Sequence, residues 1–268
     1  MARRLRCGPH HSPVPCGYAG LVDNTASRTR TIVVTGAGSG IGRACALRLA
    51  GPRACVLALD LDEESARQTR NRIEAVGNLA VAVACDITDG ASVRSVFAGL
   101  ETVDVLINSA GVENQRAQAG TTAEDMRHMY EVNAIGLLTV TQAALPRMPD
   151  GARIINIGSR GYRGSPEHAH YVASKAAVVA LTRTLAVELC CRQIMVNAVA
   201  PGPVRTPLPD DLPPERLAQV AAGYPGGRLP EPEDVAHAVA FFADPATRHI
   251  NGQILVLDGG RSVGLSPA

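Results

Sequence analysis

Residues 31–42 read T-I-V-V-T-G-A-G-S-G-I-G. The first five are mostly β-branched and predict a short buried strand, and the apolar spacing of Ala44, Leu47 and Leu49 beyond the glycines predicts a helix. A strand, a glycine-rich turn and a helix N-terminus can bind a pyrophosphate, because backbone N–H groups face it and no β-carbon intervenes. The spacing is T-G-x-x-x-G-x-G, with Ile41 where the common dinucleotide fingerprint has its third glycine. If the glycine-rich turn is considered alone, the alternative to a pyrophosphate site is a turn with a purely structural role.

The next apolar run, residues 54–59, predicts a strand that ends on Asp60. A carboxylate at this position can accept hydrogen bonds from the ribose hydroxyls of an adenosine and would repel a 2′-phosphate. Ser39 in the turn offers no cation to offset that repulsion, and Arg43 lies past the turn, on the helix. The electrostatics therefore favour NAD over NADP. In the alternative interpretation, Asp60 only caps the helix that begins near Asp62.

Apolar runs and helical patterns alternate along the rest of the chain. Further strands are predicted at residues 79–85, 103–107, 153–157, 195–199 and 253–257, and the main helices at residues 92–100, 121–148 with a break at Gly136, 171–189 and 231–243. This alternation predicts one α/β domain with a doubly wound parallel sheet of about seven strands and helices on both faces. Ligands of such sheets bind beyond the carboxyl ends of the strands. Residues at such ends are those of the glycine turn, Asp60, Asp86, Asn108, Ser159 and Thr206.

Residues 159–175 hold a serine, a tyrosine twelve residues later and a lysine four residues after that. Lys175 is the only lysine in the chain, and every other basic side chain counted with it is an arginine. This exception indicates that the position requires an ammonium rather than a guanidinium. Tyr171 and Lys175 project from one helix face, and the ammonium is expected to lower the phenol's pKa towards the range useful for acid–base chemistry. Ser159 can donate a hydrogen bond to a substrate oxygen. The alternative is a surface tyrosine beside an exposed lysine.

The substrate is less well defined by the sequence. Arg160, Arg163 and His168 lie close to Ser159 and could select an acidic substrate, although solvated loop charges explain them equally simply. The pocket walls are expected at residues 112–118, 160–169 and 207–227, with residues 207–214 as a lid. No metal-binding constellation is present in the sequence.

The composition narrows the class of protein. The chain has 268 residues, 46% of them hydrophobic, which is enough for one large core. The net charge of +1 gives no reason to expect a nucleic-acid partner, and no apolar run is long enough to cross a membrane. The seven cysteines are scattered, and Cys45, Cys55 and Cys85 lie in apolar segments, as buried thiols do in a reducing compartment. A cytoplasmic location is therefore expected.

The two ends of the chain differ from its centre. Residues 1–30 contain arginines and prolines without periodicity and are predicted to be a disordered extension or the product of an over-extended start. Metal binding by Cys7, His10, His11 and Cys16 is disfavoured, because no second ligand pair follows at finger spacing. The predicted domain spans residues 31–262, and residues 263–268 form a C-terminal tail.

Taken in order, the motifs resemble the short-chain dehydrogenase/reductase family, in its classical subfamily, over about residues 31–260. They are T-G-A-G-S-G-I-G, the Asp86 site, N-S-A-G at residues 108–111, Asn133, Ser159, Tyr171-x-x-x-Lys175 and the P-G loop with Thr206. The resemblance implies a Rossmann-like fold and an NAD-dependent oxidoreductase that interconverts a secondary alcohol and a ketone. Ser109 departs from the family, which usually has a second Asn there. The unmatched N-terminal residues and a short connection after the helix at 92–100 are further departures.

The resemblance also implies the roles of individual residues. The catalytic set would be Asn133, Ser159, Tyr171 and Lys175, with Lys175 also binding the nicotinamide ribose and Asn133 holding a water of the proton relay. The cofactor would contact Gly36, Ser39, Gly40, Ile41, Gly42, Asp60, Leu61, Asp86, Ile87, Asn108, Ala110, Gly111, Tyr171, Lys175, Pro201, Gly202, Val204 and Thr206.

Several alternatives stay open. The first is a 3-oxoacyl-thioester reductase, which Asp60 disfavours because biosynthetic reduction usually draws on NADPH. The second is a silent dinucleotide sensor or scaffold, which need not keep all four catalytic residues. An epimerase is disfavoured by the glycine spacing. The family usually forms homotetramers or homodimers, here through the helices at residues 121–148 and 171–189.

Overall fold

The computed structural model describes residues 29–114, 120–206 and 214–263. Seven strands form one sheet in the order β3-β2-β1-β4-β5-β6-β7, and every neighbouring pair is parallel. The strands are β1 (Arg30–Thr35), β2 (Ala54–Asp60), β3 (Leu79–Ala84), β4 (Val105–Asn108), β5 (Arg153–Ile157), β6 (Met195–Pro201) and β7 (Ile254–Leu257). The strand order reverses between β1 and β4, which confirms the doubly wound parallel sheet and places its ligand crevice at that point.

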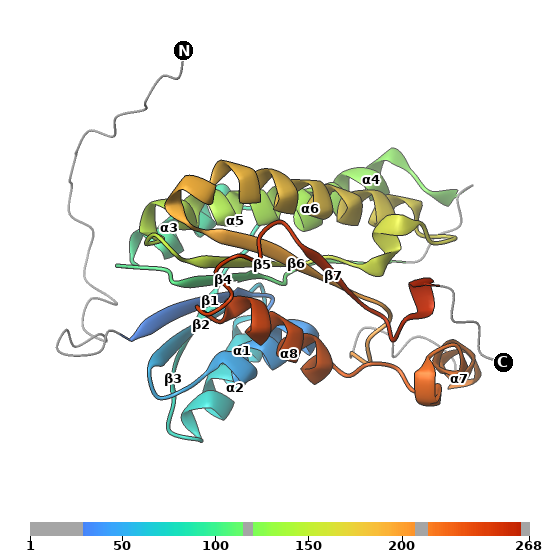
Figure 1. Ribbon diagram of the computed structural model, residues 1–268, viewed down its shortest axis with the longest axis horizontal. Coiled ribbons are helices and arrows are strands. Elements are labelled where there is room, and N and C mark those ends of the chain that lie inside the picture. The colour runs from blue at the N-terminus through green and yellow to red at the C-terminus, as the bar shows by residue number, and fades with distance from the viewer. Residues whose placement is uncertain (1–28, 115–119, 207–213, 264–268) are drawn as a thin grey trace, which may run out of the picture.

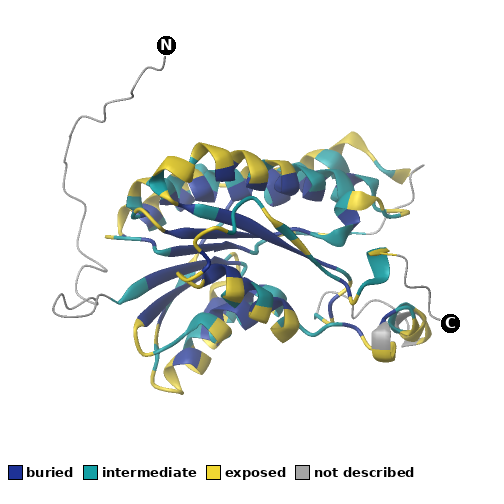
Figure 2. Cartoon of the chain, viewed as in Figure 1, coloured by how far each residue is buried: buried dark blue, intermediate teal, exposed yellow. Residues whose placement is uncertain are grey.

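Helices cover both faces of the sheet (Figure 1). One face carries α1 (Gly40–Leu49), α2 (Glu63–Glu74) and α8 (Pro232–Ala243), and the other carries α3 (Gly90–Ala98), α4 (Ala123–Tyr130), α5 (Leu137–Ala144) and α6 (Ala169–Glu188). A separate apolar core fills each interface. Val56 and Phe242 belong to the first core, and Phe97 and Leu106 belong to the second. Figure 2 shows the consequence: the inner strands are almost wholly buried, the edge strands β3 and β7 are partly exposed, and the helices bury only their inner faces.

The helix expected at residues 121–148 is interrupted at the predicted place. A π-helical segment, η2 (Glu131–Gly136), lies between α4 and α5. Gly136 is its last residue, and a β-carbon there would lie 2.8 Å from Cδ1 of Ile87, so a larger residue would displace that side chain. Such bulges are frequent at functional sites, and this one contains Asn133, which is 1% exposed.

Two helices begin two residues earlier than expected, for different reasons. The helix predicted from residue 92 starts at Gly90, after the side chain of Asp89 accepts a hydrogen bond from the N–H of Ala91. The helix predicted from residue 171 starts at Ala169, because His170 is fully buried and extends the inner face by one residue. These shifts leave the order of the elements unchanged.

Among the described residues, no helix has the length and apolar character that a bilayer span requires. Cys45, Cys55 and Cys85 are buried free thiols, and burial raises the pKa of Cys45 to about 12. The predicted cytoplasmic location stays a prediction. The expected extension, with Cys7, His10, His11 and Cys16, lies within residues 1–28, and the tail mostly within residues 264–268, outside the described residues.

Candidate active site

The glycine turn is held against the end of β4. Oγ1 of Thr35 accepts hydrogen bonds from the N–H groups of Ser109 and Ala110, both at 3.1 Å. A β-carbon on Gly36, whose φ is 65°, would lie 2.8 Å from Cα of Ala110. The two segments that the sequence assigned to the cofactor therefore touch. The sequence motif includes Thr35 but does not reveal these two hydrogen bonds, because they depend on β1 and β4 being neighbours in the sheet.

The turn itself leaves room for an anion. A β-carbon on Gly42 would collide with the carbonyl oxygen of Gly36, so the first turn of α1 packs directly on the loop. Ser39 is the N-cap of α1, but its side chain makes no capping hydrogen bond and is exposed. Cγ2 of Thr206 lies 3.2 Å from the place of a β-carbon on Gly40, which brings the P-G loop over the turn. This cradle fits a pyrophosphate bound by backbone N–H groups.

Asp60 also contacts the turn. Its Oδ2 accepts a hydrogen bond from the N–H of Gly38 at 2.7 Å, and its Oδ1 accepts one from the N–H of Asp62 at 3.0 Å. The helix cap is Asp62, which accepts from the N–H of Glu64, so the interpretation of Asp60 as a helix cap is wrong. Its carboxylate, half-buried at the end of β2, is in place to meet an adenosine ribose.

The position of Arg43 corrects one expectation. The sequence placed Arg43 past the turn, yet its guanidinium folds back and donates to the carbonyl of Gly38 and, at 3.1 Å, to Oγ1 of Thr69. Burial and the charge of Arg72 lower the pKa of Arg43, while the charge of Asp60 raises it. A cation therefore does stand beside Asp60, although its hydrogen bonds are directed to the protein.

The remaining expected cofactor residues lie around the same crevice, with different exposures. Oδ1 of Asp86 accepts from the hydroxyl and N–H of Thr88, and these hydrogen bonds lower the pKa of Asp86. Leu61 is 73% exposed beyond β2, whereas Ile87 is buried. Pro201 and Val204 are buried at the end of β6.

Asn108 differs from these residues because its side chain is used in the core. Its Nδ2 donates to Oγ1 of Thr141 and to Oδ1 of Asn156, and Nδ2 of Asn156 donates to Oγ1 of Thr182. This buried ladder ties β4 and β5 to α5 and α6. The side chain of Asn108 is buried, with Oδ1 unpartnered among the described residues, so the predicted cofactor contact would fall to its backbone.

Asn133 and Lys175 approach one another at Gly111. A β-carbon on Gly111 would lie 2.9 Å from Oδ1 of Asn133 and 3.3 Å from Nζ of Lys175. The amide of Asn133 accepts from the N–H of Val112 at 2.9 Å and donates to Oγ of Ser174, also at 2.9 Å. Nζ of Lys175 donates to the carbonyl of Ile157 at 3.0 Å. Residues from η2, β5 and α6 thus meet, as the order of motifs predicted.

Tyr171 and Ser159 complete this group. Nζ of Lys175 lies 5.8 Å from the centre of the Tyr171 ring, and Oγ of Ser159 accepts from the N–H of Gly161. Burial raises the pKa of Tyr171, as does the charge of Glu113, and a hydrogen bond with Ser159 opposes the rise. Burial also lowers the pKa of Lys175 to about 8, against the charge of Glu113. The expectation that the pKa of Tyr171 lies below its ordinary value is wrong, because burial and the charge of Glu113 raise it.

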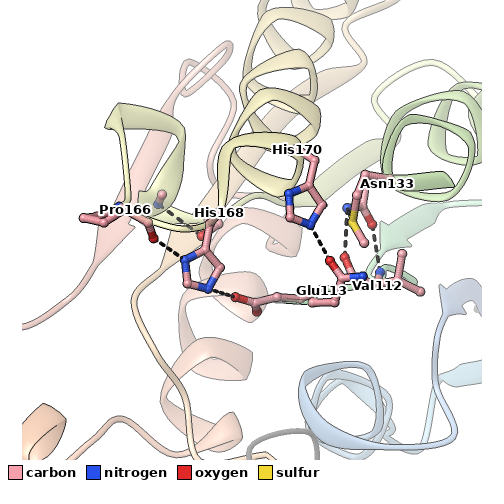
Figure 3. A network of polar contacts seen from close by, with 10 residues as sticks. Val112, Glu113, Asn133, Pro166, His168 and His170 are labelled. Atoms are coloured by element: carbon pink, nitrogen blue, oxygen red, sulfur yellow. Dashed lines mark hydrogen bonds and ion pairs between the residues drawn. The ribbon is translucent and has the colours of Figure 1, made fainter. Parts of the chain in front are cut away.

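Glu113 belongs to a polar network that the sequence did not reveal (Figure 3). Its Oε1 lies 3.6 Å from Nε2 of His168, and Nδ1 of His168 lies 2.6 Å from the carbonyl oxygen of Pro166. The His168 ring packs edge-on to Tyr171, with 6.5 Å between centroids. Next to it, Nε2 of the buried His170 bonds Oδ1 of Asn114. The loop after β4 is thereby joined to the start of α6 by two contacts, at His168 and His170.

The expected substrate cluster is divided. His168 faces Glu113 and Tyr171, whereas Cδ of Arg160 lies 3.4 Å from the place of a β-carbon on Gly202. Arg163 is exposed and bonds the hydroxyls of Tyr162 and Ser262. Parts of the expected pocket wall and lid, residues 115–118 and 207–213, lie outside the described residues. No group of three His, Cys, Asp or Glu side chains in the described part of the chain could hold a metal ion.

Comparison with known proteins identifies the family of the chain. A family model described as enoyl-(acyl carrier protein) reductase matches residues 36–262. The hydroxy(phenyl)methylsuccinyl-CoA dehydrogenase subunit BbsD of Thauera aromatica is 35% identical, over 88% of this chain and 98% of its own. The 3-oxoacyl-(acyl-carrier-protein) reductase FabG of Thermotoga maritima is 33% identical, over 86% and 97%. A 7α-hydroxysteroid dehydrogenase solved with NADH and 7-oxo glycochenodeoxycholic acid superposes with a TM-score of 0.82 at 31% identity, covering 86% of this chain and 93% of that one. The chain therefore belongs to the short-chain dehydrogenase/reductase family, in its classical subfamily, and is an oxidoreductase of a family that uses nicotinamide dinucleotide cofactors.

Proposed function

We propose that the protein is an NAD-dependent oxidoreductase that interconverts a secondary alcohol and a ketone. The observation that carries this proposal is the meeting of Asn133 and Lys175 at Gly111, one helical turn from Tyr171 and beside Ser159. A sensor or scaffold would have no use for this convergence of four separate segments. The direct test is NADH oxidation at neutral pH with a panel of ketones. No turnover with any ketone, and none with any alcohol and NAD, would favour the silent scaffold.

The cofactor would lie across the crevice between β1 and β4. The glycine turn would hold its pyrophosphate, Asp60 its adenosine ribose, Lys175 its nicotinamide ribose, and Thr206 with Val204 its carboxamide. When bound, the nicotinamide ring supplies the hydride donor or acceptor. Asp86 and Ile87 would line the adenine.

The chain's own residues manage the proton. The Oη of Tyr171 would donate its proton to the substrate oxygen during reduction and recover it during oxidation. Oγ of Ser159 would hydrogen-bond the same oxygen and stabilise the charge that develops there. Lys175 would hold a positive charge next to the phenol, and Asn133 would connect this site to water. The raised pKa of Tyr171 keeps the phenol protonated in the unliganded enzyme, so the acid needed for reduction is already in place.

Asp60 is expected to select NAD. Asp60→Ser should lower the KM for NADPH by about tenfold or more, because it removes a carboxylate that repels the 2′-phosphate and leaves Arg43 unopposed. Steady-state kinetics with both cofactors measures the ratio. Asp62→Asn is the matched control, since it removes a charge two residues away and retains a good N-cap, so the ratio should stay unchanged. Wild-type preference for NADPH would contradict the assignment.

A 3-oxoacyl-thioester reductase remains the second candidate, because the relative from Thermotoga maritima has that name. The carboxylate of Asp60 argues against a thioester reductase, because biosynthetic reduction usually draws on NADPH and the carboxylate would repel its 2′-phosphate. Assay with a 3-oxoacyl thioester and both cofactors separates the two. Efficient reduction with NADPH would select the thioester reductase.

We also propose a homotetramer or homodimer. Val187 on α6 is 74% exposed and Ile135 in η2 is 47% exposed, both on the helices expected at the interface. Light scattering should give a mass of two or four chains, and Val187→Glu should lower it, because an unpaired carboxylate would be buried. Val76→Glu, at a residue 73% exposed after α2, is the matched control and should leave the mass unchanged. A monomeric wild type would contradict the proposal.

A further inference from the structure

Three arginines gather at the carboxyl ends of β5, β6 and β7 without a carboxylate partner. Arg160 and Arg163 follow β5, and Arg261 lies in η7 (Arg261–Val263), after β7. None of the three forms an ion pair with a described residue. Other arginines do, namely Arg67, Arg70, Arg127, Arg192 and Arg205. Among the described residues, this edge of the site therefore carries positive charge without a paired carboxylate.

Arg160 meets Tyr224 at Gly202. A β-carbon on Gly202 would collide with Oη of Tyr224 and would lie 3.4 Å from Cδ of Arg160. Nε of Arg160 and Oη of Tyr224 are both buried, and neither has a hydrogen-bond partner in the part of the chain that the structure describes. Buried donors without partners destabilise a folded protein, so two of them at one place indicate a group that completes them.

The surrounding contacts hold Tyr224 in position. The guanidinium of Arg261 lies 5.2 Å from the centre of the Tyr224 ring, a cation–π contact. Nη1 of Arg163 donates to Oγ of Ser262 at 3.2 Å and so joins the loop after β5 to η7. Figure 1 shows η7, in red, beside α7 (Pro214–Ala222), near the end of β7. Tyr224 itself is 4% exposed, just after α7. Nε of Arg160 and Oη of Tyr224 therefore lie in segments that are held by contacts with η7 rather than in free loops.

A carboxylate lies near Tyr171 on the wall formed by the loop after β4. Oε1 of Glu113 lies 3.6 Å from Nε2 of His168, and its charge adds to the rise in the pKa of Tyr171 that burial causes. An anion on the substrate would be repelled from the wall that carries Glu113 and attracted to the wall that carries Arg160. Arg160 follows Ser159 directly in the chain, so an anionic group of the substrate whose oxygen Ser159 would hold could be bound by Arg160.

We propose that Arg160 and Tyr224 form a subsite for a carboxylate carried by the substrate, so that the substrate is a hydroxy or oxo carboxylic acid. Nε and a terminal nitrogen of Arg160 present the paired donors that a carboxylate accepts in parallel, and Oη of Tyr224 supplies a third. The inference rests on the proposed oxidoreductase function, because that function assigns the space beside Ser159 to the substrate.

The kinetic test compares levulinate with levulinamide, a ketone of the same shape without the charge. Wild type should prefer levulinate, and Arg160→Gln should lower kcat/KM for levulinate by about 10- to 100-fold, mainly through KM, while kcat/KM for levulinamide stays within about twofold. Tyr224→Phe should give a smaller loss, again for levulinate only. Arg160→Lys keeps the charge without the fork and should fall between. Arg228→Gln removes an exposed charge close to the same wall and is the matched control, with no expected change.

A binding test separates this inference from the proposed function. Succinate should raise the Tm of wild type saturably, and succinamide should not, and Arg160→Gln should abolish the shift while keeping the Tm of the unliganded protein. Inorganic phosphate in place of succinate tests the other common anion. If ketones are reduced without preference for levulinate and succinate gives no shift, the subsite is wrong and the oxidoreductase stands. If no ketone is reduced but succinate binds through Arg160, the subsite stands and the function is wrong. A shift with phosphate alone would overturn the carboxylate assignment.

Discussion

Tyr171→Phe is expected to lower kcat for ketone reduction by about 100- to 10,000-fold, the usual contribution of a positioned acid or base. The substitution removes one oxygen and retains the ring that packs against His168 and lies beside Lys175. The wall of the crevice should therefore stay in place, and the Kd for NADH should change by less than about twofold. Steady-state kinetics and titration of NADH fluorescence measure the two quantities.

Tyr162→Phe serves as the control for this experiment. Tyr162 lies in the same loop region, and its hydroxyl contacts only Arg163 among the described residues, so kcat should not change. If Tyr171→Phe retained activity, another group would have to donate the proton. His168 would be the first candidate, because its ring lies 6.5 Å from that of Tyr171. If Tyr171→Phe lost NADH binding together with turnover, the loss of activity would reflect damage to the fold rather than removal of the proton donor.

The parallel sheet and the residues at the ends of its strands followed from the sequence for a simple physical reason. Parallel strands that are buried on both faces are short apolar runs, such as residues 54–59, and they end where the first polar residue appears, here Asp60. Because the carboxyl ends of parallel strands share one edge, residues as distant in sequence as Thr35 and Ser109 come into contact. Local pattern and topology suffice for this much.

What the sequence did not predict depends on side-chain direction and on burial. The local sequence pattern places Arg43 on a helix, but the direction of its guanidinium, back towards the carbonyl of Gly38, depends on the tertiary structure. Glu113 and Tyr224 stand in loops without periodicity, and their importance comes from the residues they face, Tyr171 and Arg160. The pKa of Tyr171 is the clearest case, since the neighbouring lysine was visible in the sequence but the extent of desolvation was not.

Lys175→Met is expected to abolish turnover and, at neutral pH, to stabilise the unliganded protein. Burial lowers the pKa of Lys175 from its ordinary value of 10.5 to about 8, so the charged form is disfavoured in the folded state by up to about 3 kcal/mol. Methionine avoids this cost and has a similar length. It also loses the hydrogen bond from Nζ to the carbonyl of Ile157, which is worth about 1 kcal/mol. The net gain of about 2 kcal/mol should raise the Tm by about 4 to 8 °C at pH 7.

The pH dependence distinguishes this cause from better packing. Because the folded pKa lies below the unfolded one, the unfolded chain binds more protons between about pH 8 and 10.5, and wild-type stability gains from this residue as pH rises through that interval. The Tm advantage of Lys175→Met over wild type should therefore be largest below pH 8 and shrink towards pH 10, while effects common to both proteins cancel in the difference. An advantage that stays constant with pH would come from packing, and a lower Tm at pH 7 would mean that the ammonium is better solvated than its burial suggests. In either case burial of the charged group of Lys175 would not be the source of a cost in stability. The expected result is that this single lysine destabilises the empty enzyme and is retained for the charge that it holds beside Tyr171 in the reaction.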